Sequence, residues 1–143
     1  MTTATISAFE NTLQKTNIWL KDILTELNWE GSDHERAFHA LRVVLHALRD
    51  RLTVEEASDF AAQLPMLVRG FYYEGWNPSK TPVATHKRDE FLAPIAASFA
   101  NDITADAEEI TRAVFKVITE HVSAGEVNDM KGALPKKIRE LWD

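Results

Sequence analysis

The chain has 143 residues, 45% of them apolar, and its 22 acidic side chains outnumber the 16 basic ones to give a formal charge of -6. A chain of this size can bury a core without metals or disulfides, which argues against the disordered and disulfide-stabilised classes. The acidic balance argues against nucleic acid and anionic membranes as partners, because both require a dense Lys/Arg surface. Thiolate chemistry is excluded, because there is no cysteine.

The start of the sequence lacks the basic and then apolar pattern of a signal peptide, and no apolar segment reaches membrane-spanning length. We therefore expect a cytoplasmic protein.

Every long segment has an apolar period near 3.6 residues, which predicts an all-α fold. The first helix is expected from about Ser7 to Asn28, with an apolar stripe facing the core. Two further apolar residues, Ile18 and Trp19, point away from this stripe and could form a small self-association patch. The stripe consists of Phe9, Leu13, Thr16, Leu20, Ile23, Leu24 and Leu27.

A second helix is expected after the break at Gly31, Ser32 and Asp33. It has a main apolar face and, opposite, a flank of small residues, so we expect it to be covered on two sides and to lie centrally. The main face consists of Phe38, Leu41, Val44, Leu45, Leu48 and Leu52, and the flank of Ala37, Ala40, Val43 and Ala47.

Short capped helices follow in both halves of the chain. Thr53 to Glu56 and Ser123 to Glu126 both have the pattern of a capping box, in which the hydroxyl and the Glu carboxylate each cap a backbone N–H. Pro65 and Pro135 are expected to end one short helix and to open the next.

The segment Asn77 to Lys87 has no periodicity and is expected to be a loop. After it, Phe91, Leu92, Ile95 and Phe99 indicate a fifth helix. Because Pro94 interrupts that pattern, we expect this helix either to begin only near Phe91 or to be kinked.

Residues 42–72 and 112–142 align without gaps, and seven of the 31 paired positions are identical. A unit used twice predicts the architecture. We expect an all-α orthogonal bundle of about eight helices, formed by two repeated four-helix units packed into a single domain over residues 1–143. Unit one spans about 7–76, the connecting loop 77–87 and unit two about 88–143.

The identical charged pairs include Glu56/Glu126, Asp59/Asp129 and Arg69/Arg139. Two hypotheses fit them: a functional role, or a structural one in which the glutamates cap helices and each aspartate pairs with an arginine. We favour the structural hypothesis, because residues kept in both copies serve what the copies share.

Catalytic patterns are sparse. His39 and His46, with Glu35 and Asp50, could share one face of the second helix and bind a metal, but the second copy has Glu109 and Lys116 at the two histidine positions. We find no serine elbow and no Gly-rich phosphate loop. We therefore expect no catalytic residues, no metal and no cofactor.

The segment Gly70 to Pro78 is rich in aromatic residues. Tyr73 and Trp76 have no counterpart in the second copy, so either Trp76 is a plug over the helix ends or it forms a binding surface with Tyr73 and Arg69. The second alternative rests on the enrichment of Tyr, Trp and Arg at interaction hot spots.

The stretch ALRVVLHALRDRLTVEEASDFAAQLPMLVRGFYYEGW and the closing LPKKIRELW resemble the bacterial family known as domain of unknown function 2267. This resemblance, from about Phe9 to Trp142, implies a helical bacterial protein and carries no activity or site residues with it. We therefore hypothesise a non-enzymatic binding or assembly module, with itself (as a homo-oligomer) or an unidentified protein as its partner. The alternative is a small hydrolase or metal-dependent enzyme using the His39/His46 face.

Overall fold

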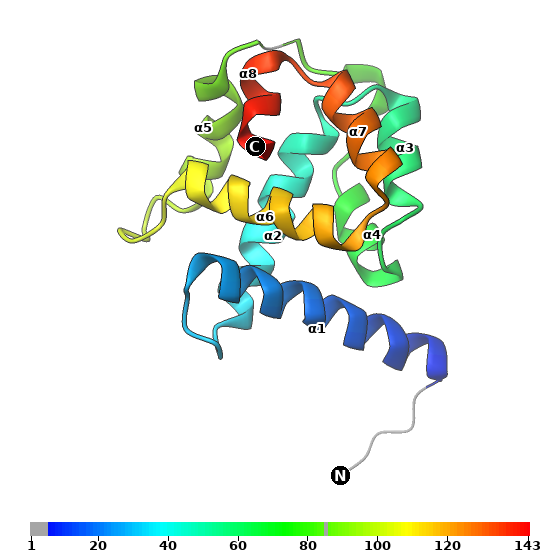
Figure 1. Cartoon of the computed structure of the whole chain (residues 1–143), viewed down its shortest axis with the longest axis vertical. Coiled ribbons are helices and arrows are strands. Elements are labelled where there is room, and N and C mark those ends of the chain that lie inside the picture. The colour runs from blue at the N-terminus through cyan, green and yellow to red at the C-terminus, as the bar shows by residue number, and fades with distance from the viewer. Residues whose placement is uncertain (1–5, 85) are drawn as a thin grey trace.

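The computed structural model describes residues 6–84 and 86–143, and all of the regular structure in these ranges is helical (Figure 1). None of the described helices is both long and apolar enough to cross a membrane. The α-helices are α1 (Ser7–Leu27), α2 (His34–Arg49), α3 (Val54–Ala61), α4 (Met66–Tyr73), α5 (Arg88–Ser98), α6 (Ala107–His121), α7 (Ala124–Ala133) and α8 (Lys136–Arg139). Two short 3-10 helices, η1 (Pro78–Lys80) and η2 (Glu140–Trp142), complete the set.

The central position predicted for the second helix is confirmed. Helix α2 packs against α1, α4, α5 and α6, and α6 packs in turn against α1, α2, α5, α7 and η2. Both sides of α2 are buried, the main face through residues such as Leu41 and Leu45 and the flank through Ala37 and Ala40. Buried side chains from all eight α-helices form one connected apolar cluster.

Helix α1 has the predicted length but not the predicted burial. Its C-terminus at Leu27 is followed by Asn28 in the left-handed conformation. The stripe is buried at Leu20, Ile23 and Leu24, whereas Phe9 and Leu13 are about half exposed, at 51% and 50%. The expectation that the whole stripe faces the core is therefore wrong at Phe9 and Leu13, in the first two turns of α1.

The capping boxes form only in part. The hydroxyl oxygens of Thr53 and Ser123 accept from the N–H groups of Glu56 and Glu126, at 3.1 and 3.2 Å. The reciprocal bond to a Glu carboxylate is missing in both copies within the described residues. The Ser123 N–H instead donates to Gln63 Oε1 at 2.8 Å.

Helices α4 and α8 begin directly after Pro65 and Pro135, as predicted. The turns before them are held by arginines: Arg69 donates to the carbonyl of Leu64 at 3.0 Å, and Arg139 donates to that of Leu134 at 3.1 Å. The predicted pairing of an aspartate with an arginine is wrong, because neither Asp59 nor Asp129 forms an ion pair among the residues described.

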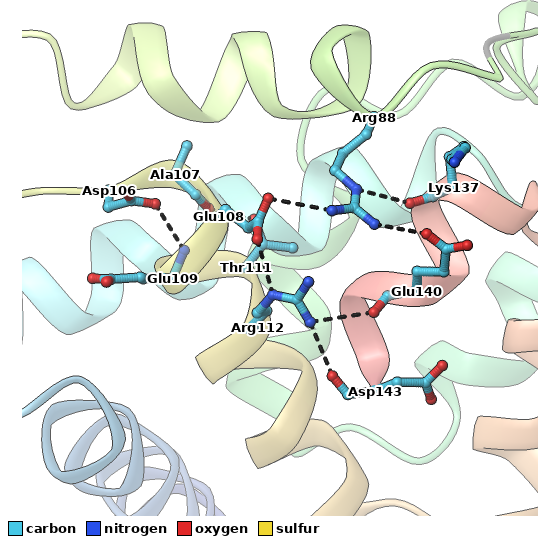
Figure 2. A network of polar contacts seen from close by, with 10 residues as sticks. All are labelled: Arg88, Asp106, Ala107, Glu108, Glu109, Thr111, Arg112, Lys137, Glu140 and Asp143. Atoms are coloured by element: carbon cyan, nitrogen blue, oxygen red, sulfur yellow. Dashed lines mark hydrogen bonds and ion pairs between the residues drawn. The ribbon is translucent and has the colours of Figure 1, made fainter.

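Helix α5 begins at Arg88, three residues before Phe91, and contains Pro94. Figure 2 shows the polar contacts of Arg88, the first residue of α5. The Arg88 guanidinium donates to the Lys137 carbonyl and to the carboxylates of Glu108 and Glu140, at 3.1, 3.4 and 3.0 Å. The N-terminus of α5 is thereby tied to both α6 and the C-terminal segment, so the helix starts earlier than its apolar pattern indicates.

Candidate functional site

The first candidate is a hollow between α1, the α3–α4 turn and the end of α6, with a volume of about 560 Å³. Thr12 fixes the geometry of this hollow, because its hydroxyl accepts from the Leu67 N–H at 2.9 Å and so joins α1 to the first turn of α4. The lining residues that matter below are Lys15, Ile18, Gln63, Met66, Arg69 and His121.

Apolar side chains are unusually exposed around this hollow. Ile18 and Met66, which line it, are both 50% exposed, and Leu67, Phe9 and Leu13 on the same two helices are exposed to a similar degree. Clusters of exposed apolar side chains mark interaction surfaces more often than isolated ones do.

The charge of the hollow differs from that of the chain. Its lining includes Lys15 and Arg69 and no acidic residue, although the chain as a whole carries -6. The three guanidinium hydrogen bonds of Arg69 go to the carbonyls of Ala61, Ala62 and Leu64. Carbonyl groups do not neutralise the positive charge of Arg69, so the hollow is locally basic.

At the α6 end, His121 is held in place from two sides. Its Nε2 lies 2.7 Å from an Asp22 carboxylate oxygen, and its ring stacks on Trp19 with centroids 5.0 Å apart. Trp19 is only 3% exposed. The expectation that Trp19 forms a surface patch with Ile18 is therefore wrong, because Trp19 packs into the core beneath that residue.

Of the three residues singled out by the sequence, Arg69 lines the hollow, whereas Tyr73 and Trp76 are not among its lining residues. Tyr73 and Trp76 pack on each other, with ring centroids 5.3 Å apart, and both contact the apolar core. The Trp76 Nε1 is buried and has no hydrogen-bond partner. This packing agrees with the alternative in which Trp76 is a plug, and less well with the alternative in which it forms a binding surface with Tyr73 and Arg69.

The two histidines of α2 face different neighbours. His39 Nε2 lies 2.9 Å from the Ser98 carbonyl at the end of α5, and His46 Nε2 donates to the Phe71 carbonyl of α4 at 2.6 Å. Burial lowers the pKa of His46 below its usual value. Each imidazole already serves a helix contact, so the structure does not bring the two together as a metal-binding face.

A second candidate, which the sequence alone did not assemble, lies between α3 and α7. Oxygens of Glu56, Glu126 and Asp129 all lie within 4.8 Å of one another, and this is the one group of three or more potential metal ligands in the described part of the chain. Glu126 is only 9% exposed. Burial, followed by the neighbouring carboxylates of Glu56, Asp59 and Asp129, raises the Glu126 pKa to about 7.

A signal for this cluster was present in the sequence. Glu56 and Glu126 are paired positions when residues 42–72 are aligned with residues 112–142, and so are Asp59 and Asp129. The packing of α3 on α7 brings these positions close together.

The fold and these two features define a helical protein that has a basic, apolar-rimmed hollow and no assembled set of catalytic groups among the residues described. The chain belongs to the family described as uncharacterized conserved protein (DUF2267), whose model matches residues 16–141. This confirms the resemblance found in the sequence. No curated protein matches the chain.

Proposed function

We propose that this protein is a non-enzymatic assembly module that binds a second copy of itself through the hollow and its apolar rim. The observation that carries this proposal is the half-exposure of Ile18 and Met66 beside a basic hollow. Apolar side chains supply most of the favourable free energy of association, and complementary charge orients the partners.

Charge supports a second copy as the partner. A chain with 22 acidic and 16 basic side chains presents mostly acidic surface, and Lys15 and Arg69 make the hollow locally basic. Each protomer therefore has a basic hollow, and it also has acidic surface that can bind in the hollow of a second protomer. We propose the bacterial cytoplasm as the location of this module, because the family resemblance found in the sequence implies a bacterial protein.

Light scattering over a range of protein concentrations tests the proposal. The wild type is expected to gain mass with concentration, and Ile18→Glu is expected to abolish the gain. Ile103→Glu is the matched control, because Ile103 is 99% exposed, belongs to the loop between α5 and α6 and does not line the hollow. A wild type that stays monomeric at every concentration would contradict the assembly role.

We also infer that the scaffold arose from two copies of a four-helix unit. Three pairs of equivalent features support this: the caps Thr53 and Ser123, the helix starts at Pro65 and Pro135, and the arginine contacts to Leu64 and Leu134. Equivalent helices also pack on each other, α2 on α6 and α3 on α7. A duplicated scaffold of this kind needs no catalytic residue to explain its repeated positions.

The alternative, an enzyme that uses His39 and His46, receives no support from a shared site. A specific observation would revive it, namely hydrolysis of a test ester that is lost in His46→Gln and kept in His34→Gln, where His34 is exposed.

A further inference from the structure

The carboxylate cluster between α3 and α7 has no role in the proposed assembly. Glu56 and Glu126 lie in the first turns of these helices. Because Gln63 takes the Ser123 N–H, the Glu126 carboxylate is not used as a cap. It lies instead within 4.8 Å of the carboxylates of Glu56 and Asp129.

Two oxygens of this cluster are buried without a partner. Oε1 of Glu56 and Oε1 of Glu126 are both inaccessible to solvent and accept no hydrogen bond from a donor. The Glu126 side chain is nine-tenths buried. Buried polar atoms are nearly always satisfied by a protein group, a water or an ion, so these two oxygens require a ligand or a proton.

No basic side chain among the described residues forms an ion pair with these carboxylates. Within residues 6–84 and 86–143, none of the salt bridges involves Glu56, Glu126, Asp129 or the neighbouring Asp59. A proton shared between Glu56 and Glu126 would satisfy that pair alone. A divalent cation would also neutralise Asp129, the third member of the cluster.

The spacing suits a large, oxygen-preferring cation. Three atoms that lie within 4.8 Å of one another fit in a circle of radius 4.8/√3, so one position is within about 2.8 Å of all three. Calcium–oxygen distances are about 2.3–2.6 Å, whereas magnesium requires about 2.0–2.1 Å and a stricter geometry. Small side-chain adjustments reach the calcium distance, and Asp129, being exposed, leaves room for waters to complete the coordination.

We propose that Glu56, Glu126 and Asp129 form a calcium-binding site that joins α3 to α7. The bound ion links the third helix of one half of the chain to the third helix of the other. Calcium therefore stabilises the contact between the two halves, and chelation weakens it. This role is independent of the hollow, which involves none of these three residues.

Titration calorimetry of the chelator-treated full chain with CaCl₂, and separately with MgCl₂, tests the proposal. We expect one Ca²⁺ per chain and weaker Mg²⁺ binding, with a calcium-dependent rise in the melting temperature. Glu126→Gln and Asp129→Asn should each weaken calcium binding by about tenfold or more, because each removes one anionic ligand. Asp129→Asn changes an exposed side chain, so it is the variant expected to fold without difficulty.

Glu55→Gln is the matched control. Glu55 is exposed on α3, the helix of Glu56, but its carboxylate is not one of the three clustered ligands. This variant should bind calcium within about twofold of the wild type, because salt screens an exposed charge outside the site. The proposal is overturned if the wild type binds no Ca²⁺ up to about 10 mM, well above the weakest calcium sites of proteins. It is equally overturned by a preference for Mg²⁺, or by unchanged calcium affinity in both ligand variants.

Discussion

Gln63 and Ser123 are joined by two hydrogen bonds across 60 residues of sequence. The Gln63 Oε1 accepts from the Ser123 N–H at 2.8 Å, and its Nε2 donates to the Ser123 Oγ at 3.0 Å. The carboxamide thereby takes the place that Glu126 would fill in a complete capping box. One side chain from the turn between α3 and α4 thus caps α7, and the Glu126 carboxylate faces Glu56 instead.

Gln63→Ala should lower the free energy of unfolding by about 1 kcal/mol, since it removes both hydrogen bonds at an exposed position. Urea unfolding monitored by circular dichroism measures the loss. Gln14→Ala is the control, because Gln14 is an exposed residue of α1 and makes no such contact. Equal stabilities for the two variants would show that the Gln63–Ser123 pair contributes nothing.

Glu126→Gln should change the pH dependence of stability in chelator-treated protein. The folded-state pKa of Glu126 is raised from 4.5 to about 7. The folded chain therefore holds a proton that the unfolded chain releases at lower pH, and stability falls as the pH rises from about 4.5 through about 7. The loss is on the order of 2 kcal/mol.

Urea unfolding at about pH 5 and about pH 8 brackets this transition. Glu126→Gln should flatten the difference between the two conditions, because glutamine does not titrate. Glu55→Gln is the control, since Glu55 is exposed on the same helix as Glu56. A wild type that is more stable at the higher pH would contradict the view that burial and neighbouring carboxylates raise the pKa of Glu126.

Arg69→Gln should reduce the free energy of unfolding by about 2 kcal/mol. The substitution removes a charged donor that holds three backbone carbonyls at the end of α3 and in the segment that follows it. Arg139→Gln should cost less, since Arg139 donates to the Leu134 carbonyl alone. Thermal unfolding of the two variants ranks them. The reverse order would contradict the view that the number of carbonyls held determines the contribution of each arginine.

His46→Gln tests a pH effect of the opposite sign. Burial lowers the folded-state pKa of His46 below 6.5, so the unfolded chain takes up a proton first. The stability associated with neutral His46 is present above about pH 6.5 and is lost as the pH falls through the folded-state pKa.

Glutamine at position 46 retains an N–H for the Phe71 carbonyl and does not titrate, so this loss at acidic pH should shrink. Chemical unfolding at about pH 7.5 and about pH 5 measures it. His34→Gln serves as the comparison, because His34 is exposed at the start of α2. The same response in both variants would argue against a special role for burial at His46.

Lys15→Glu should weaken self-association, because it reverses a positive charge in the lining of the hollow. The effect should be largest at low ionic strength, since salt screens exposed charges. Sedimentation at about 20 and about 300 mM NaCl measures both effects. Lys80→Glu, in the η1 turn, changes the net charge equally and should leave association unchanged.

Part of the candidate hollow could be anticipated. The sequence points to Ile18, an apolar residue outside its stripe, and to Arg69, beside an aromatic segment, and both line the hollow. It points equally to Tyr73 and Trp76, but these two pack on each other and are not among the lining residues. Sequence spacing places residues on a helix face, but it does not indicate which faces meet.

The sequence by itself determined that the chain is helical and where α3, α4, α7 and α8 begin. Thr53, Ser123, Pro65 and Pro135 act within three or four residues of their own position, so local chemistry was enough to place α3, α4, α7 and α8. Tertiary structure alone decided which surfaces are covered. Phe9 and Leu13 remain half exposed, although they belong to the stripe that buries Leu20. Glu126 faces Glu56 because α3 packs on α7 and Gln63 occupies its cap, and such partners lie too far along the chain for any local pattern to identify them.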